Sequence, residues 1–218
     1  MRTLYRACPF NSSNRPPIFE EDKIKLLEMC LESFIKAKPK EITFLLDRMP
    51  EEQWKMFSKY GEIVDCSGLG NVGTFHKQIE MGRMYGKVFF CEDDYYWRPD
   101  TFPLLEKAVD TFDFVSPYDH PSHYVDDPRF ERKYEVQLID NIAYRDSPSN
   151  TLTFATTDSV LQDNWTKMMT FGIADHPMFE ALRQDGYRIW CPTYSFATHM
   201  VNGLLAPNID WPFLKTLT

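Results

Sequence analysis

Residues 87–99 read Lys-Val-Phe-Phe-Cys-Glu-Asp-Asp-Tyr-Tyr-Trp-Arg-Pro. The apolar run up to Cys91 is typical of a short strand buried on both faces. Three adjacent carboxylates follow it, Glu92, Asp93 and Asp94. They repel one another, so we expect a compensating cation, and oxygen ligands suit Mg²⁺ or Mn²⁺ better than zinc. The alternative is an exposed acidic turn ahead of a helix that begins at Pro99.

The same alternation of apolar runs and helical patterns extends over residues 1–117. It predicts strands and helices in strict alternation, and therefore an α/β fold with mostly parallel strands. Ligands in such folds lie beyond the carboxyl ends of the strands, where Asp47 and the acidic triplet would converge. The expected strands are 3–8, 41–47, 61–66, 87–91 and 113–117, and the expected helices are 20–37, one from 50, one of about ten residues after the glycine-rich loop 68–73, and one from 99.

After Pro117 the pattern changes. Residues 134–144 and 151–155 are expected to pair as a hairpin around the turn 145–150. Helices are expected at 159–170 and 175–185, a strand at 186–191, and a surface tail at 192–218. With no internal repeat or linker, we expect one domain over 1–218, in which 1–117 bind a ligand and 118–218 form a second half.

Composition excludes several classes of protein. The 218 residues are 43% hydrophobic and carry a net charge of −8, which argues against disorder and against nucleic-acid or anionic-membrane binding. No apolar run approaches the roughly 20 residues that span a bilayer. The start lacks a signal-peptide pattern, and five scattered cysteines without a Cys-x-x-Cys pair fit neither disulfides nor zinc. We expect buried thiols and a cytoplasmic protein.

The order of elements around Val88–Pro99 resembles the GT-A class of glycosyltransferases, in which an apolar strand ends in an Asp-x-Asp or Glu-Asp-Asp motif before a proline and a helix. The resemblance is to compact, phage-encoded members, and it implies a GT-A (Rossmann-like) α/β/α sandwich and a metal-dependent enzyme that uses a UDP-sugar. Residues 1–117 would be the nucleotide-sugar-binding half, and 118–218 the acceptor-binding half, with a short β-hairpin and helical part and a C-terminal tail. It implies that Asp94 is the direct metal ligand and that Glu92 and Asp93 position ribose, water or sugar hydroxyls. Asp47 matches the acid that binds uracil; its alternative role is to cap the helix near Pro50.

The resemblance implies further contacts with the donor. Arg6 would meet the base or diphosphate, or simply pair with a surface acid. Asn71, Thr74 and Lys77 resemble the loop and helix start that embrace the nucleoside, where backbone N–H groups can bind phosphate. His199 matches a carboxy-terminal histidine that reaches the metal in several GT-A enzymes; the alternative is a structural histidine.

An inverting enzyme also needs a carboxylate that deprotonates the acceptor hydroxyl. Asp175, in Phe171-Gly-Ile-Ala-Asp-His-Pro, is the first candidate and Asp158 the second. Either residue can instead be an ordinary helix cap. The segment around His120 and His123 could line the sugar pocket, and five aromatic residues could stack on an acceptor sugar or belong to the core: Tyr95, Tyr96, Trp97, Tyr118 and Tyr124.

These observations favour a Mn²⁺- or Mg²⁺-dependent hexosyltransferase, inverting, with UDP-glucose as the default donor and a carbohydrate or other hydroxyl acceptor. A sugar-nucleotide nucleotidyltransferase is the alternative enzyme, although residues 9–15 lack the glycines that such enzymes carry after the first strand. A non-catalytic carbohydrate- or nucleotide-binding module is the third reading. The sequence indicates neither the acceptor nor the oligomeric state.

Overall fold

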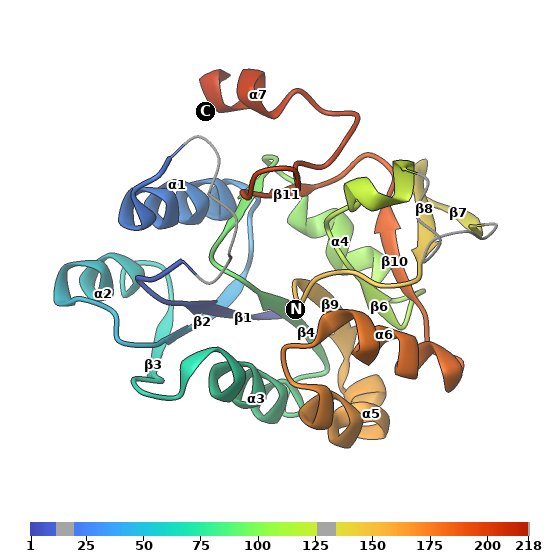
Figure 1. Ribbon diagram of the computed structural model, residues 1–218, viewed down its shortest axis with the longest axis horizontal. Helices are drawn as coiled ribbons and strands as arrows, with labels where there is room; N and C mark the ends of the chain where they lie inside the picture. Colours follow the sequence, from blue (N-terminus) through green and yellow to red (C-terminus); the bar gives the residue numbers. More distant parts are fainter. Residues whose placement is uncertain (12–19, 126–133, 218) are drawn as a thin grey trace.

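The computed structural model describes residues 1–11, 20–125 and 134–217. A nine-stranded sheet forms its centre, in the spatial order β3-β2-β1-β4-β9-β6-β10-β8-β7. Its strands take residues from both halves of the chain (Figure 1). In sequence order they are β1 (Arg2–Ala7), β2 (Glu41–Leu46), β3 (Glu62–Asp65), β4 (Lys87–Cys91), β6 (Phe114–Val115), β7 (Val136–Ile139), β8 (Ile142–Ser147), β9 (Phe154–Thr157) and β10 (Ile189–Pro192).

The helices cover both faces of this sheet. They are α1 (Lys23–Lys36), α2 (Glu51–Phe57), α3 (Gly70–Gly82), α4 (Phe102–Ala108), α5 (Asp158–Phe171), α6 (Asp175–Gln184) and α7 (Trp211–Leu217). Among the described residues there are also a 3₁₀ turn, η1 (Pro121–Tyr124), and a small sheet of β5 (Tyr95–Trp97) and β11 (Ala197–His199).

Strand direction confirms the expected mostly parallel α/β architecture. β1 pairs in parallel with β2 on one side and with β4 on the other. The chain therefore leaves β1 in one direction and returns on the opposite side for β4. This reversal opens a crevice at the carboxyl ends of β1 and β4. β9 is antiparallel to both β4 and β6.

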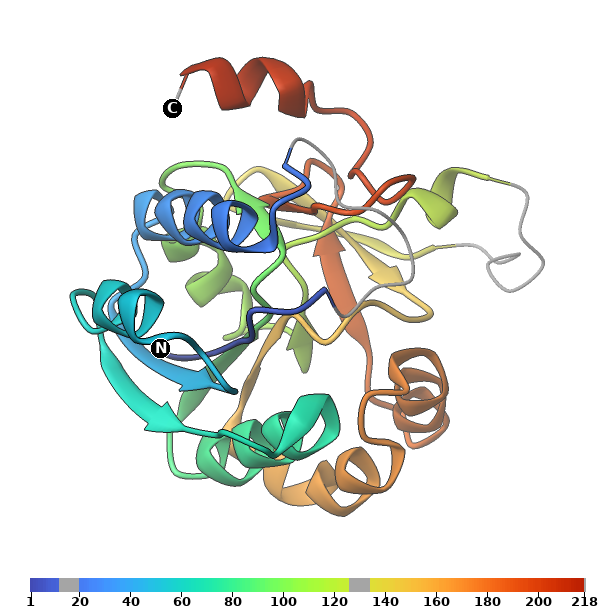
Figure 2. The ribbon, with the colours of Figure 1, turned by 60° about the vertical axis from the view of Figure 1, so that its left-hand side comes forward.

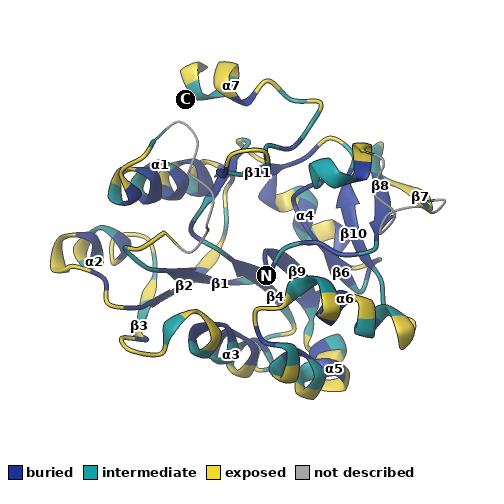
Figure 3. Ribbon diagram, viewed as in Figure 1, coloured by how far each residue is buried: buried dark blue, intermediate teal, exposed yellow. Residues whose placement is uncertain are grey.

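Neighbouring residues of each strand enter different cores, because side chains alternate across a sheet. Tyr5 and Phe89 belong to the cluster that contains α1, α2 and α4, whereas Leu4 and Phe90 belong to the cluster with α3, α5 and α6. Figures 1 and 2 show α1 and α2 on one side of β1 and β2, and α3 on the other. In Figure 3 the central strands are buried, whereas exposed residues gather on the edge strands β3 and β7 and on the outer faces of the helices.

A glycine sets how closely α3 approaches the sheet. A Cβ atom on Gly82 would lie 2.8 Å from Phe90 Cζ and 3.1 Å from Leu161 Cδ1. No larger residue fits there without displacing α3 from β4 and α5.

Four details differ from the sequence predictions. The hairpin joins β7 to β8 through Asp140 and Asn141, both with positive φ (49° and 64°), and not through residues 145–150. β9, expected to complete that hairpin, lies between β4 and β6. The glycine-rich stretch forms the first turn of α3, and β5 and β11 were not predicted.

Two other expectations concern the whole chain. All five cysteines are free thiols; four are buried, and Cys8 is partly exposed. Across the described ranges, no helix is both long enough and apolar enough to cross a membrane.

Candidate active site

A cleft lies where β1, β2 and β4 end. Its volume is about 190 Å³, and it opens to solvent on one side. Residues from the loop after β1, the end of β2, the start of α3 and the end of β4 line it. Seven of the sequence-predicted site residues are among them: Arg6, Asp47, Asn71, Thr74, Glu92, Asp93 and Asp94.

Each acid of the triplet pairs with a cation of the chain itself. Arg6 Nη2 lies 2.5 Å from Glu92, Lys23 Nζ 2.7 Å from Asp93, and His199 Nε2 3.0 Å from Asp94. The three cations come from β1, α1 and β11. Basic side chains of the chain itself therefore supply compensating charge to the triplet.

The Glu92 carboxylate has two partners. It accepts from Arg6 and from the hydroxyl of Thr153 at 3.3 Å. The other Arg6 nitrogen donates to the side-chain oxygen of Asn71 and to its carbonyl oxygen. Burial raises the pKa of Glu92, and the Arg6 charge opposes that rise. Arg6 therefore joins the end of β4 to the start of α3, and it lines the cleft.

Asp93 is directed toward α1. One carboxylate oxygen accepts from Lys23, and the other accepts from the Cys8 N–H at 2.9 Å. Burial raises the Asp93 pKa while Lys23 opposes it. Sequence reasoning missed Lys23, a cation in the first turn of a helix, where the helix dipole disfavours it. A lysine at this unfavourable position was the feature of the sequence that indicated an acidic partner for Lys23.

Asp94 and His199 meet through the small sheet. His199 is paired in register with Tyr95, and Met200 N–H donates to the Asp94 carbonyl at 2.8 Å. The imidazole stacks on the Tyr95 ring, with centroids 4.9 Å apart and planes 9° apart. Burial opposes charge on both groups, but their attraction dominates: it lowers the pKa of Asp94 and raises that of His199.

This pair has the properties of a divalent-metal site. Asp94 Oδ1 and His199 Nδ1 are buried and have no hydrogen-bond partner among the described residues. Buried polar atoms are normally satisfied, so an orphaned carboxylate oxygen marks a missing partner. The residues present therefore fit Mg²⁺ or Mn²⁺.

Asp47 occupies the other end of the cleft. It is 4% exposed, accepts the Gly68 N–H at 2.8 Å and lies 3.3 Å from the Arg48 guanidinium. It does not cap α2, whose N-cap is Pro50 without a side-chain hydrogen bond. Asp47 therefore lines the cleft with both carboxylate oxygens held by Arg48 and Gly68.

Two of the α3 residues that were expected to bind the nucleoside, Thr74 and Lys77, have different positions relative to the cleft. Thr74 is in the cleft wall, where its hydroxyl donates to the Gly70 carbonyl at 2.6 Å. Lys77 does not line the cleft; it is 42% exposed and faces Glu80 at 3.8 Å. The structure therefore does not bring Lys77 to the proposed donor.

The two candidate bases lie at opposite ends of the sheet. Asp175 opens α6, and its charge influences the pKa of both Glu92 and His199. Burial raises the pKa of Asp175 itself. Asp158 is exposed, and its N–H donates to Gly86, just before the start of β4, whereas the cleft lies beyond the end of that strand. We therefore withdraw Asp158 as a candidate base.

The predicted aromatic platform is wrong for four of its five residues. Tyr95, Tyr96, Trp97 and Tyr118 are at most 4% exposed and belong to the core, whereas Tyr124 is 46% exposed. They are needed to pack β5 under α1 and to support His199.

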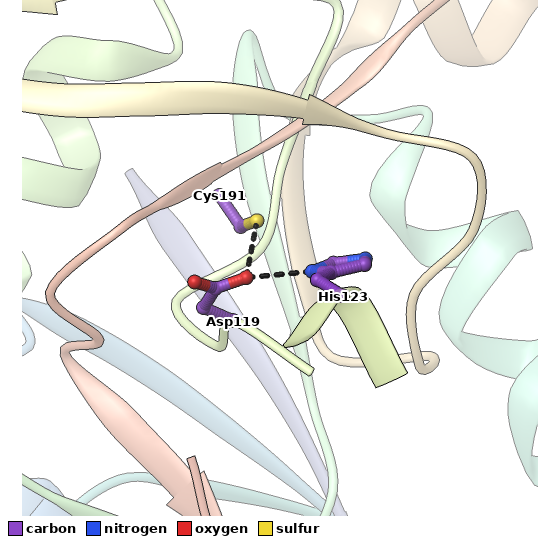
Figure 4. A group of neighbouring side chains, drawn as sticks. All are labelled: Asp119, His123 and Cys191. Atoms are coloured by element: carbon purple, nitrogen blue, oxygen red, sulfur yellow. Dashed lines mark hydrogen bonds and ion pairs between the residues drawn. The ribbon is translucent and has the colours of Figure 1, made fainter. Parts of the chain in front are cut away.

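A second polar cluster lies under η1 (Figure 4). Asp119, His123 and Cys191 place potential metal-ligand atoms within 4.8 Å of one another. However, Arg145 binds both oxygens of Asp119, and burial raises the pKa of the Cys191 thiol well above its usual value. His123 bridges Asp119 at 2.6 Å and Ser147 at 2.8 Å. We interpret this cluster as a structural network rather than part of the sugar pocket.

Comparisons with known proteins show which solved structures have a similar fold. No protein-family model matches the chain, and no curated protein does. Among solved structures, GalNAc-T7 with UDP, GalNAc and Mn²⁺ is similar with a TM-score of 0.62 at 10% identity, covering 94% of this chain and 45% of that one. The fold is GT-A-like.

Two further structures share this GT-A-like fold. The glycosyltransferase GlyE of Streptococcus pneumoniae has a TM-score of 0.51 at 12% identity, covering 86% of this chain and 44% of that one. The 4-diphosphocytidyl-2C-methyl-D-erythritol synthase of Anaerococcus prevotii has a TM-score of 0.54 at 14% identity, covering 99% and 95%. At these identities the likeness establishes the fold alone.

Proposed function

We propose that the chain is a divalent-metal-dependent glycosyltransferase that moves a hexose from a UDP-sugar to a hydroxyl acceptor. Glucose is the first sugar to test. The observation that carries this proposal is the buried, unpartnered Asp94 oxygen beside His199, at the strand end where the cleft opens. The resemblance to GT-A glycosyltransferases gives Asp47 the role of binding the uracil.

Each residue has a task in transfer. Asp94 and His199 would hold Mn²⁺ or Mg²⁺, which supplies Lewis-acid neutralisation of the departing diphosphate. Arg6 adds a second positive charge on the same wall of the cleft. Asp175 would accept the proton of the acceptor hydroxyl, and its raised pKa makes it a stronger base than an exposed aspartate. A base on the face opposite the leaving group implies inversion.

Calorimetric titration of UDP tests the metal site. We expect UDP binding that depends strongly on Mn²⁺ in the parent protein. Asp94→Asn should bind UDP with little response to Mn²⁺ while keeping the parent circular dichroism spectrum. Equal Mn²⁺ dependence in parent and variant would remove Asp94 as the ligand.

A nucleotidyltransferase is the second candidate, because the A. prevotii synthase is matched over 95% of its length. An array of nucleotide sugars, scored for UDP release, tests the first function. Nucleoside triphosphates with sugar phosphates, scored for pyrophosphate release, test the second. Pyrophosphate release without UDP release would replace the proposed function by the alternative.

A further inference from the structure

Three exposed apolar side chains lie beside the cleft. Leu69, Val72 and Ile173 are 49%, 45% and 39% exposed. Leu69 and Val72 are three residues apart at the start of α3 and so share one face of that helix. Gly70 and Asn71, between them in sequence, line the cleft. We call these three side chains the apolar lip.

Gly172 joins the two parts of the lip. A Cβ atom at Gly172 would lie 3.5 Å from Val72 Cγ1 and 3.7 Å from His76 Nε2. The turn after α5 therefore packs directly on α3, and Ile173 is the next residue. The φ of Gly172 is +54° with ψ −125°, a conformation that glycine alone adopts readily.

The turn then leads at once to the proposed base. Asp175 N–H donates to the Ile173 carbonyl at 3.1 Å, and Ala174 N–H donates to Phe171 at 3.1 Å. The Asp175 carboxylate thus stands within one tight turn of the lip. A molecule whose hydroxyl reaches Asp175 therefore lies within one turn of Ile173.

We propose that the apolar lip binds an alkyl or aryl group of the acceptor, next to the hydroxyl that receives the sugar. This inference rests on the proposed function, because Asp175 as base fixes where that hydroxyl lies. Leu, Val and Ile side chains offer no hydrogen bonds, so they stabilise apolar groups and leave sugar hydroxyls without partners. The acceptor class is therefore a hydroxyl compound with an apolar substituent rather than a free sugar.

Octyl β-glucoside, below its micelle concentration, and methyl β-glucoside isolate the alkyl contribution. Saturation-transfer NMR with Mg²⁺ and UDP present should show that the octyl compound binds about tenfold tighter or more, since each buried methylene adds roughly fourfold. Val72→Asn and Ile173→Asn should reduce octyl binding toward the methyl level. Met84→Asn is the matched control, because Met84 is 67% exposed beyond the other end of α3.

Equal binding of the two glucosides, or an octyl preference that survives in both lip variants, overturns the inference. Cleavage of nucleotide sugars by the parent protein is measured separately. Cleavage without an octyl preference would contradict the proposed role of the lip but not the proposed function. Octyl binding at the lip without cleavage of any nucleotide sugar overturns the proposed function, and with it the acceptor role of the lip.

Discussion

At the scale of single residues, the site is defined by how charge is balanced. Burying three acids together would cost free energy, and each acid pairs with one basic side chain, Arg6, Lys23 or His199. Because each cation comes from a different element, the acids also fix α1 and β11 to the end of β4. In the Asp94 pair a carboxylate oxygen and a ring nitrogen stay buried without a partner, and in the Glu92 pair Arg6 Nε does, so Asp94 is the acid of the three with an unpartnered oxygen.

Lys23 gives the clearest test of that balance. Lys23→Met leaves the Asp93 charge buried with only the Cys8 N–H, and should lower the free energy of unfolding by about 3–5 kcal/mol in urea denaturation. Adding Asp93→Asn should restore much of it, because asparagine can still accept from Cys8. Lys55→Met, at an exposed helix pair with Glu51, is the control and should cost much less. A double variant as unstable as Lys23→Met would contradict this account.

Asp175 is tested by comparison with Asp158. Asp175→Asn should retain UDP binding but lose transfer by a factor of about 10² or more, the usual contribution of a general base. Asp158→Asn should keep transfer near the parent rate, because this residue lies at the far end of β4. Steady-state UDP release with a working acceptor measures both. Retained transfer in Asp175→Asn would remove the base and point to retention of configuration.

At the scale of elements, the sequence predicted the helices and strands whose positions depend on local patterns. The alternation of β1, α1, β2, α2, β3, α3 and β4 was predicted because each apolar run has its own periodicity and breakers. The hairpin was misplaced because Asp140-Asn141 lacks the glycine that usually marks a two-residue turn. β5 and β11 have three residues each, too short to show a period, and their pairing spans about 100 positions.

Gly82 shows how one residue fixes the distance between elements. Gly82→Ala should lower the free energy of unfolding by about 1–3 kcal/mol, since the added methyl group overlaps Phe90 and Leu161. Gly86→Ala is the matched control. It has no atom within 4 Å of its added Cβ and should be neutral or slightly stabilising. Guanidinium denaturation measures the free energy of unfolding of both variants. Equal stability of the two variants would mean that α3 shifts without cost.

At the scale of the whole molecule, the site depends on contacts that join the two ends of the chain. Asp94 and His199 are 105 residues apart and meet only because β11 pairs with β5. The sequence could name both residues from the resemblance, yet it could not predict their pairing, since no local pattern encodes a contact of that range. The burial of the aromatic residues after Asp94 was missed for the same reason.

This long-range pair should make the stability of the fold depend on pH. The raised pKa of His199 means that its contribution is complete below its ordinary pKa of 6.5 and is lost as pH rises through the higher folded value. The lowered pKa of Asp94 means that its contribution is present above its ordinary 3.8 and is lost as pH falls toward the folded value. The pair therefore stabilises the fold most between about pH 4 and 6.5.

His199→Gln isolates this effect, because glutamine can still donate a hydrogen bond to Asp94 but does not titrate. In urea denaturation with EDTA present, the free energy of unfolding of the parent should fall more steeply from pH 6 to pH 8.5 than that of the variant. All other titrating groups are common to both proteins, so they cancel in the difference. Parallel curves would mean that His199 carries no extra proton in the folded protein, and that the Asp94 carboxylate is balanced by Lys23 and Arg6 alone.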